Sequence, residues 1–187
     1  MKHIADYQGG LLNHLNLSYR AGDRDLALEL IRAIGLTVVE TKFTDMTLIS
    51  AYPNPEDMNG DSNVIFLLEL PAHQAELDAV IRKKAESDPE LAEALDNCRE
   101  RARGSPDRGS HIGIRCTSNA ALDAILDHLS TGVSKELGER ITVVEMPRHE
   151  PVAGFPNDIR QVFVHTDVVL SGATAVGQNI ELQALRG

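Results

Sequence analysis

Two histidines and two glutamates occupy matching places in the two halves of this 187-residue sequence. His14 and His111 each lie in the first strand-like run of a half, and Glu69 and Glu181 lie in the last. Each of the four interrupts a largely apolar run. Imidazole nitrogens and carboxylate oxygens are ligands that divalent first-row metals accept. If the four side chains converge, they predict a mixed nitrogen and oxygen metal site.

Side chains alternate between the two faces of a strand, and this alternation decides where the four residues point. The apolar residues expected on the opposite faces are Leu15 and Leu17 for His14, Leu68 and Leu70 for Glu69, Ile112 and Ile114 for His111, and Ile180 and Leu182 for Glu181. Because the apolar faces can take the helices, we expect both histidines and both glutamates on the other faces of the sheets. Each residue alone is typical of a solvent-facing strand position, and only the repeated placement favours a site.

The elements that must position these residues occur twice along the chain. The expected strands and helices are strand 11–19, helix 25–35 and strands 36–42, 46–52 and 64–70, then strand 110–117, helix 120–132 and strands 141–147, 161–169 and 175–183. The tetrapeptide TVVE recurs at 37–40 and 142–145, and the spacing from His14 to Gly35 equals that from His111 to Gly132. These matches predict a duplicated βαβββ module.

A charged helical segment separates the two modules. Residues 72–104 have the pattern of two amphipathic helices broken at Asp88 and Pro89, where Asp88 can cap the second helix. We therefore expect a first module at 1–71, a helical connector at 72–109 and a second module at 110–187. Apolar stripes that include Leu77 and Val80 would dock on the outer surface or mediate a homodimer.

Composition excludes several classes of protein. The formal net charge of −10 and the scarcity of aromatic residues, with no Trp, argue against nucleic acid as a partner. The apolar runs are far shorter than the roughly 20 residues of a membrane-spanning helix, and the first ten residues lack a signal-peptide core. Two cysteines outside a CxxC arrangement do not make a disulfide framework. These features predict a cytoplasmic protein that does not contact membranes.

The segments NHLNL, LLELP, SHIGI and GQNIELQ resemble the ligand-bearing first and last strands of the vicinal oxygen chelate superfamily. This superfamily includes glyoxalase I, extradiol dioxygenases and the bleomycin resistance proteins, and the resemblance covers 11–71 and 110–183. It implies an α+β fold in which tandem βαβββ modules form a cupped mixed sheet around one metal site. By resemblance the metal ligands are His14, Glu69, His111 and Glu181, and they hold one divalent Zn, Ni, Mn, Co or Fe per chain.

The ligand set is similar to that of glyoxalase I, which implies a metal-dependent lyase or isomerase. A metal that chelates two adjacent oxygens of a small-molecule substrate acidifies the neighbouring C–H and stabilises the enediolate formed when a base removes the proton. By resemblance Glu181 is the base and Glu69 its partner across the metal, although the residues alone do not distinguish them. Arg115, on the same strand face as His111, and Asn16 are candidate substrate-binding residues.

Two other functions remain open within the same superfamily. An extradiol-type dioxygenase would use an Fe(II) triad of His14, His111 and Glu181. A non-catalytic drug-binding resistance protein would shelter a cationic ligand, which the acidity of the chain suits. His165 is expected to be a surface or hydrogen-bonded core histidine. The modules could pair within one chain or swap with those of a second chain.

Overall fold

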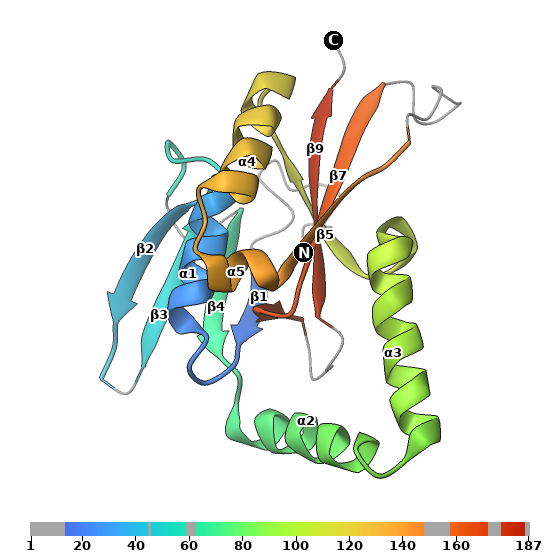
Figure 1. Cartoon of the computed structure of the whole chain (residues 1–187). Coiled ribbons are helices and arrows are strands. Elements are labelled where there is room, and N and C mark those ends of the chain that lie inside the picture. The colour runs from blue at the N-terminus through green and yellow to red at the C-terminus, as the bar shows by residue number, and fades with distance from the viewer. Residues whose placement is uncertain (1–13, 45, 59–62, 148–157, 172–176, 186–187) are drawn as a thin grey trace, which may run out of the picture.

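Among the residues that this computed structural model describes, 14–44, 46–58, 63–147, 158–171 and 177–185, the chain forms two mixed β-sheets and five α-helices. The fold is therefore α+β (Figure 1). The first half of the chain supplies four of the five strands of the first sheet, and the second half supplies all four strands of the second.

The first sheet has the strand order β2-β3-β4-β1-β8. Its elements from the first half, with the helix that follows the first strand, are β1 (His14–Tyr19), α1 (Arg24–Ala33), β2 (Thr37–Lys42), β3 (Thr47–Tyr52) and β4 (Val64–Glu69). Strand β1 runs parallel to β4, while β4 and β3, and β3 and β2, are antiparallel. The first and last strands of the half are therefore neighbours.

The second sheet has the strand order β5-β9-β7-β6. The elements of the second half are β5 (His111–Arg115), α4 (Asn119–Thr131), α5 (Lys135–Glu139), β6 (Ile141–Glu145), β7 (Ile159–Thr166), β8 (Val169–Leu170) and β9 (Gln178–Leu185). Strand β5 is parallel to β9, and the pairs β9 and β7, and β7 and β6, are antiparallel. This arrangement repeats that of β1, β4, β3 and β2.

One short strand of the second half extends the first sheet. Strand β8 pairs antiparallel with β1, in the register Ser18 to Leu170 and Tyr19 to Val169. Val169 is fully buried there. The second half of the chain thus supplies the edge strand of the first sheet, next to β1.

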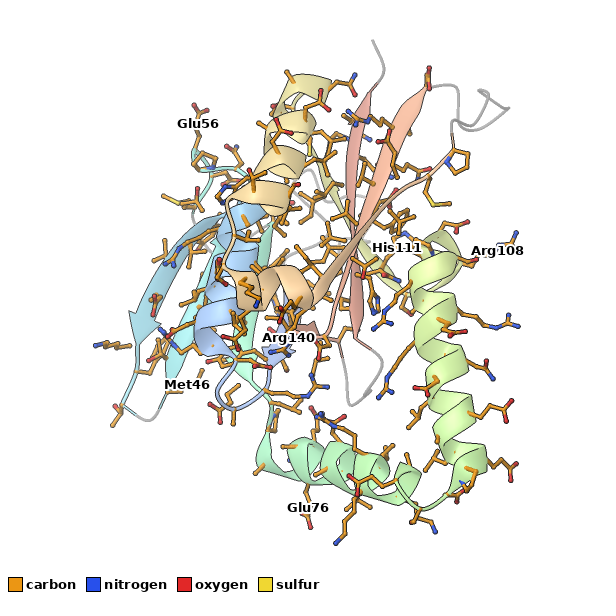
Figure 2. The ribbon with its side chains drawn as sticks, viewed as in Figure 1. Met46, Glu56, Glu76, Arg108, His111 and Arg140 are labelled. Atoms are coloured by element: carbon orange, nitrogen blue, oxygen red, sulfur yellow. The ribbon has the colours of Figure 1, made fainter. Side chains whose placement is uncertain are left out.

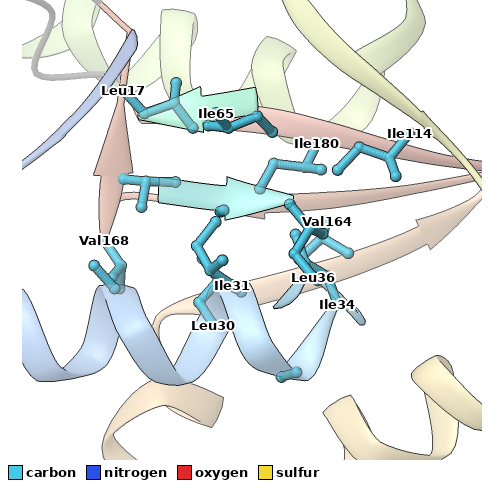
Figure 3. Packing of buried hydrophobic residues seen from close by; sticks show 14 of the residues in the cluster. Leu17, Leu30, Ile31, Ile34, Leu36, Ile65, Ile114, Val164, Val168 and Ile180 are labelled. Atoms are coloured by element: carbon cyan, nitrogen blue, oxygen red, sulfur yellow. The ribbon is translucent and has the colours of Figure 1, made fainter. Parts of the chain in front are cut away.

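Helices α1 and α4 cover the apolar faces of the sheets and share one hydrophobic core (Figure 3). The residues labelled in the close-up come from both halves: Leu17, Leu30, Ile31, Ile34, Leu36 and Ile65 from the first, and Ile114, Val164, Val168 and Ile180 from the second. Full burial of a leucine or isoleucine side chain contributes about 1.5–3 kcal/mol. Gly35 ends α1 with a φ of +89°, and a Cβ there would lie 3.3 Å from Ile125 of α4.

The connector folds as the sequence predicts, as two helices with a break before Pro89. These are α2 (Ala72–Ala85) and α3 (Pro89–Gly104), and the Asp88 side chain caps α3 by accepting a hydrogen bond from the Leu91 amide at 3.2 Å. The short 3-10 helix η2 (Pro106–Arg108) leads into β5. None of the helices that the structure describes is long and apolar enough to cross a membrane.

The predicted apolar stripe of α2 is not covered by the described residues. Leu77 and Val80 are 50% and 57% exposed, and the residue that α2 buries is Asp78. Arg20 and Arg82 both contact the Asp78 carboxylate, so a buried ion-pair cluster holds this helix. Burial raises the pKa of the Asp78 carboxyl group. The hydrogen bonds from Arg82 and Arg20 lower it, and together with the charges of these arginines they leave the pKa below its ordinary value. The expectation of a homodimer through α2 remains a prediction.

Candidate acid-base site on the second sheet

The second sheet has one polar face, opposite the face that packs on the core. The register of β5 with β9 is continuous, so paired residues share a face. The polar face carries His111, Gly113 and Arg115 from β5, Asn179, Glu181 and Gln183 from β9, and Gln161, Phe163 and His165 from β7. Ile112, Ile114, Ile180 and Leu182 lie on the other face, as the alternation predicts.

Glu181 is the buried acidic group of this face. It is 2% exposed, and its Oε2 lies 3.3 Å from Nε2 of His111. The amides of Gln183 and Gln161 both donate to Oε1, Gln183 at 2.6 Å. A carboxylate removed from water needs such partners, because an unpaired buried charge costs several kcal/mol.

His111 lies between the buried carboxylate and solvent. Its side chain is 30% exposed, and its Nδ1 lies 2.9 Å from the carbonyl oxygen of Gly109. Both ring nitrogens therefore face acceptors, and the ring satisfies both only when each nitrogen carries a proton. With a hydrogen on Nε2, His111 can donate to Glu181 or to a molecule bound beside it.

Gly113 leaves an opening over Glu181. It is the register partner of Glu181, and a Cβ built on Gly113 would lie 3.5 Å from Oε2. Among the described residues, chain neighbours aside, no other atom lies within 4 Å of that position. Among the described residues, the missing side chain thus leaves space beside Oε2, between His111 and Arg115 on the strand.

Arg115 flanks this opening on the side away from His111. It shares the exposed edge of β5 with His111 and Gly113. It makes no ion pair with any residue in the described part of the chain. The sequence left open whether Arg115 pairs with a neighbouring carboxylate or binds an anionic substrate group, and the geometry favours the second role.

The first half does not bring its histidine and glutamate together. In the β1 and β4 pairing, His14 lies opposite Val64 while Glu69 lies opposite Tyr19, at the other end of the strands. Glu69 lies on the same face of the sheet as Tyr19 and Leu67, and both of these side chains are buried in the core. His14 lies on the opposite face and is exposed. The prediction that His14 and Glu69 share a face is therefore wrong.

The error arises because β4 is apolar on both faces. The sequence analysis assigned Leu68 to the covered face, but Leu67 is the fully buried residue and Leu68 is only half-buried. The residue next to His14 is Phe66, whose ring centroid lies 5.1 Å from that of the histidine. Strand alternation fixes which residues share a face, but it does not say which face the helix covers.

The described residues do not fit the predicted four-ligand metal centre. A structural metal site has four protein ligands and a catalytic one usually has three. Among the described residues, which include His14, Glu69, His111 and Glu181, no group of three or more His, Cys, Asp or Glu side chains could hold a metal ion. The geometry brings His111 and Glu181 together and supplies no third ligand of these types.

The remaining predicted residues have separate surroundings. Asn16 is exposed on β1, on the face of His14, and its register partner is Phe66. His165 is buried, and its Nδ1 lies 3.0 Å from Oδ1 of Asn179, so it is a hydrogen-bonded core histidine as expected. Burial lowers the pKa of His165 below its ordinary value, more than the Asn179 hydrogen bond raises it.

Sequence reasoning missed three contributors to the site, namely Gly113, Gln161 and Gln183. Gly113 and Gln183 each lie two positions from a predicted residue on the same strand, so alternation alone could have placed them beside the site. Gln161 comes from β7, and only the pairing of β7 with β9 brings it to Glu181. No local signal in the sequence indicates that pairing.

A cavity of about 510 Å³ lies beside this face, between the end of α3 and the start of β9. Gly109 and Ser110, which precede His111, line it together with Asn179, the register partner of His111. The Asn179 side chain also donates to the carbonyl of Ala102 in α3 at 3.0 Å. The cavity is large enough to hold a small organic molecule.

Comparisons with known proteins add little to this geometry. No family model matches the sequence, and no curated protein matches it either. Among solved structures, the chain is similar to hypothetical protein SA1046 from S. aureus, with a TM-score of 0.43 and 10% sequence identity over 91% of this chain and 94% of that one.

Proposed function

We propose that the protein binds a small molecule at the polar face of the second sheet and moves a proton between its carbon atoms, as an isomerase or lyase. The single observation that carries the proposal is the opening at Gly113, which leads to the buried Oε2 of Glu181 between His111 and Arg115. General acid-base catalysis requires a base and an acid held within hydrogen-bond reach of one reacting group.

In this proposal Glu181 removes a proton from a hydroxyl-bearing carbon next to a substrate carbonyl. The C–H bond breaks, the proton moves to Oε2, and the electron pair passes into an enediolate. His111 donates its Nε2 proton to the carbonyl oxygen, and Arg115 pairs with the anionic part of the substrate. To complete an isomerisation, Glu181 returns its proton to the former carbonyl carbon, and His111 accepts the proton of the other hydroxyl group, on the carbon that Glu181 deprotonated, so that this carbon becomes the new carbonyl.

The metal centre and the cupped arrangement of two modules around it remain predictions from the resemblance. No step of the mechanism passes through a metal, because the described residues offer two ligands of the predicted four. An extradiol dioxygenase would need His14 beside His111 and Glu181, and these three do not form a group that could hold iron. We therefore favour proton transfer over oxygen chemistry.

Deuterium exchange tests the proposal without knowledge of the natural substrate. A panel of 2-oxoaldehydes and their thiol adducts would be incubated with the full chain in D₂O, and deuterium incorporation at carbon followed by NMR. Glu181→Gln retains hydrogen-bonding groups but lacks the base, so we expect the exchange rate to fall about 100-fold or more.

The matched control is Glu69→Gln, which removes the other predicted carboxylate. Because Glu69 is exposed on a different sheet, we expect wild-type exchange in this variant. Equal losses in both variants, or full exchange in Glu181→Gln, would contradict the assignment of Glu181 as the base. Absence of exchange in the wild-type chain across the panel, with and without added divalent metal, would favour a binding protein without catalysis.

A further inference from the structure

A second cavity, of about 330 Å³, is bordered by α2, α3 and the strands β6 and β7, and arginine dominates its lining. Five arginines line it, namely Arg20, Arg82, Arg99, Arg103 and Arg140, against two acidic residues. The chain as a whole has a formal net charge of −10, so this concentration of positive charge is local. A cavity whose lining carries more positive than negative side chains attracts anions.

Three of the arginines have structural roles that explain their presence. Arg140, labelled in Figure 2, makes hydrogen bonds of 2.7 and 2.9 Å to Asp23 and one of 2.9 Å to Asp167. Arg20 contacts the buried Asp78 at 3.2 Å, and Arg82 contacts the same carboxylate. These pairs tie α1, α2 and the end of β7 together, and they need no ligand to account for them.

Folding does not explain Arg99 and Arg103. They lie four positions apart on α3, so they are neighbours on one helix face, where like charges destabilise a helix. Arg99 pairs at 2.9 Å with Asp96 of its own helix, an exposed contact of small energetic value. Among the described residues, Arg103 has no carboxylate within ion-pair distance. Arg82 faces the same cavity from α2.

We propose that this cavity binds a small multivalent anion of the phosphate class, such as a diphosphate group, through Arg99 and Arg103. The planar guanidinium group forms two parallel hydrogen bonds with phosphate oxygens, and an anion between Arg99 and Arg103 would remove their repulsion. Thr142 and His165 add hydrogen-bonding groups to the lining. None of the residues that surround Glu181 lines this cavity, so the inference stands apart from the proposed catalytic function.

The test is calorimetric titration of the full chain with inorganic pyrophosphate at constant ionic strength. We expect saturable binding that weakens about 100-fold in the double variant Arg99→Gln/Arg103→Gln, because each charge-assisted hydrogen bond is worth roughly tenfold or more. Both side chains lie on the helix surface, and circular dichroism would verify that the variant folds.

The matched control is Arg101→Gln/Arg108→Gln, which removes the same charge from residues that line the other cavity. In this variant we expect an affinity within about twofold of the wild type, since distant exposed charges are screened by salt. Equal weakening in both double variants would mean non-specific attraction and would overturn the proposal. Absence of pyrophosphate binding, or tighter binding of citrate than of pyrophosphate, would overturn it as well.

Discussion

The two halves of the chain have the same strand order, but the histidine on the first strand of each half has different neighbours. If His14 is aligned with His111, the strand pairing aligns Asn16 with Gly113 and Phe66 with Glu181. In the first half the ring of Phe66 therefore lies where the second half has a buried carboxylate, and Asn16 stands where the second half has an opening. The same architecture thus supports a histidine on an aromatic ring in one sheet and an acid-base pair in the other.

The strand order is repeated in the two halves, but the pairing of histidine with glutamate is not. Glu69 and Glu181 end up in different relations to their histidines, because a change of one residue in register moves a side chain to the other face of a sheet. In the second half the register partner of Glu181 is Gly113, two residues beyond His111. In the first half the partner of Glu69 is Tyr19, five residues beyond His14 and on the opposite face.

The largest effect that separates the halves is expected from substitutions at Gly113 and Asn16. Gly113→Val places a branched side chain over Oε2 of Glu181, and valine suits a strand, so the fold should be kept. We expect deuterium exchange to fall about 100-fold when the path to the base is blocked. Asn16→Val, at the matching position of β1, should leave exchange unchanged. A loss of exchange in Asn16→Val would instead support its predicted role in substrate binding.

The two glutamates should also differ in their contribution to stability. Glu181→Ala removes the acceptor that His111, Gln161 and Gln183 share, so we expect the free energy of unfolding to fall by about 3 kcal/mol. Glu69→Ala, at an exposed strand end, should change it by less than about 0.5 kcal/mol. Urea denaturation of both variants measures the difference. Similar values for the two would mean that Glu181 is not held as described.

The smallest effect is a pH dependence that we expect from His165 in the second half. Burial and the nearby Arg103 lower the pKa of His165, and these effects outweigh the opposing ones of Asn179 and Asp167. Since the unfolded chain binds the proton more readily, stability should fall as pH decreases below the ordinary histidine pKa of 6.5. The slope for one proton is at most about 1.4 kcal/mol per pH unit.

The matched measurement compares urea denaturation between pH 7 and pH 5 in the wild type and in His165→Gln. The variant should lose this component of the slope. In the first half the matching strand position is held by Tyr52. An unchanged slope in His165→Gln would show that another group causes the acid sensitivity.

Much of the fold could be predicted from the sequence. Hydrophobic periodicity predicted the four strands and one helix of the first half in their order, and Asp88 and Pro89 located the break between α2 and α3. The polar face of the second sheet followed from alternation, since Ile112 and Ile114 mark the covered face of β5 without ambiguity. In β4 every residue before Glu69 is apolar, so the pattern could not identify the covered face.

The sequence by itself determined the α+β class, the order of the elements and the face shared by His111, Glu181 and Arg115. Each of these depends on local periodicity, which a short stretch of chain contains. Only the tertiary structure decided the register of β1 with β4, the hydrogen bond from Gln161 to Glu181, and the position of arginines from α2 and α3 around one cavity. These depend on pairing between residues far apart in the chain, and packing of the whole core selects that pairing.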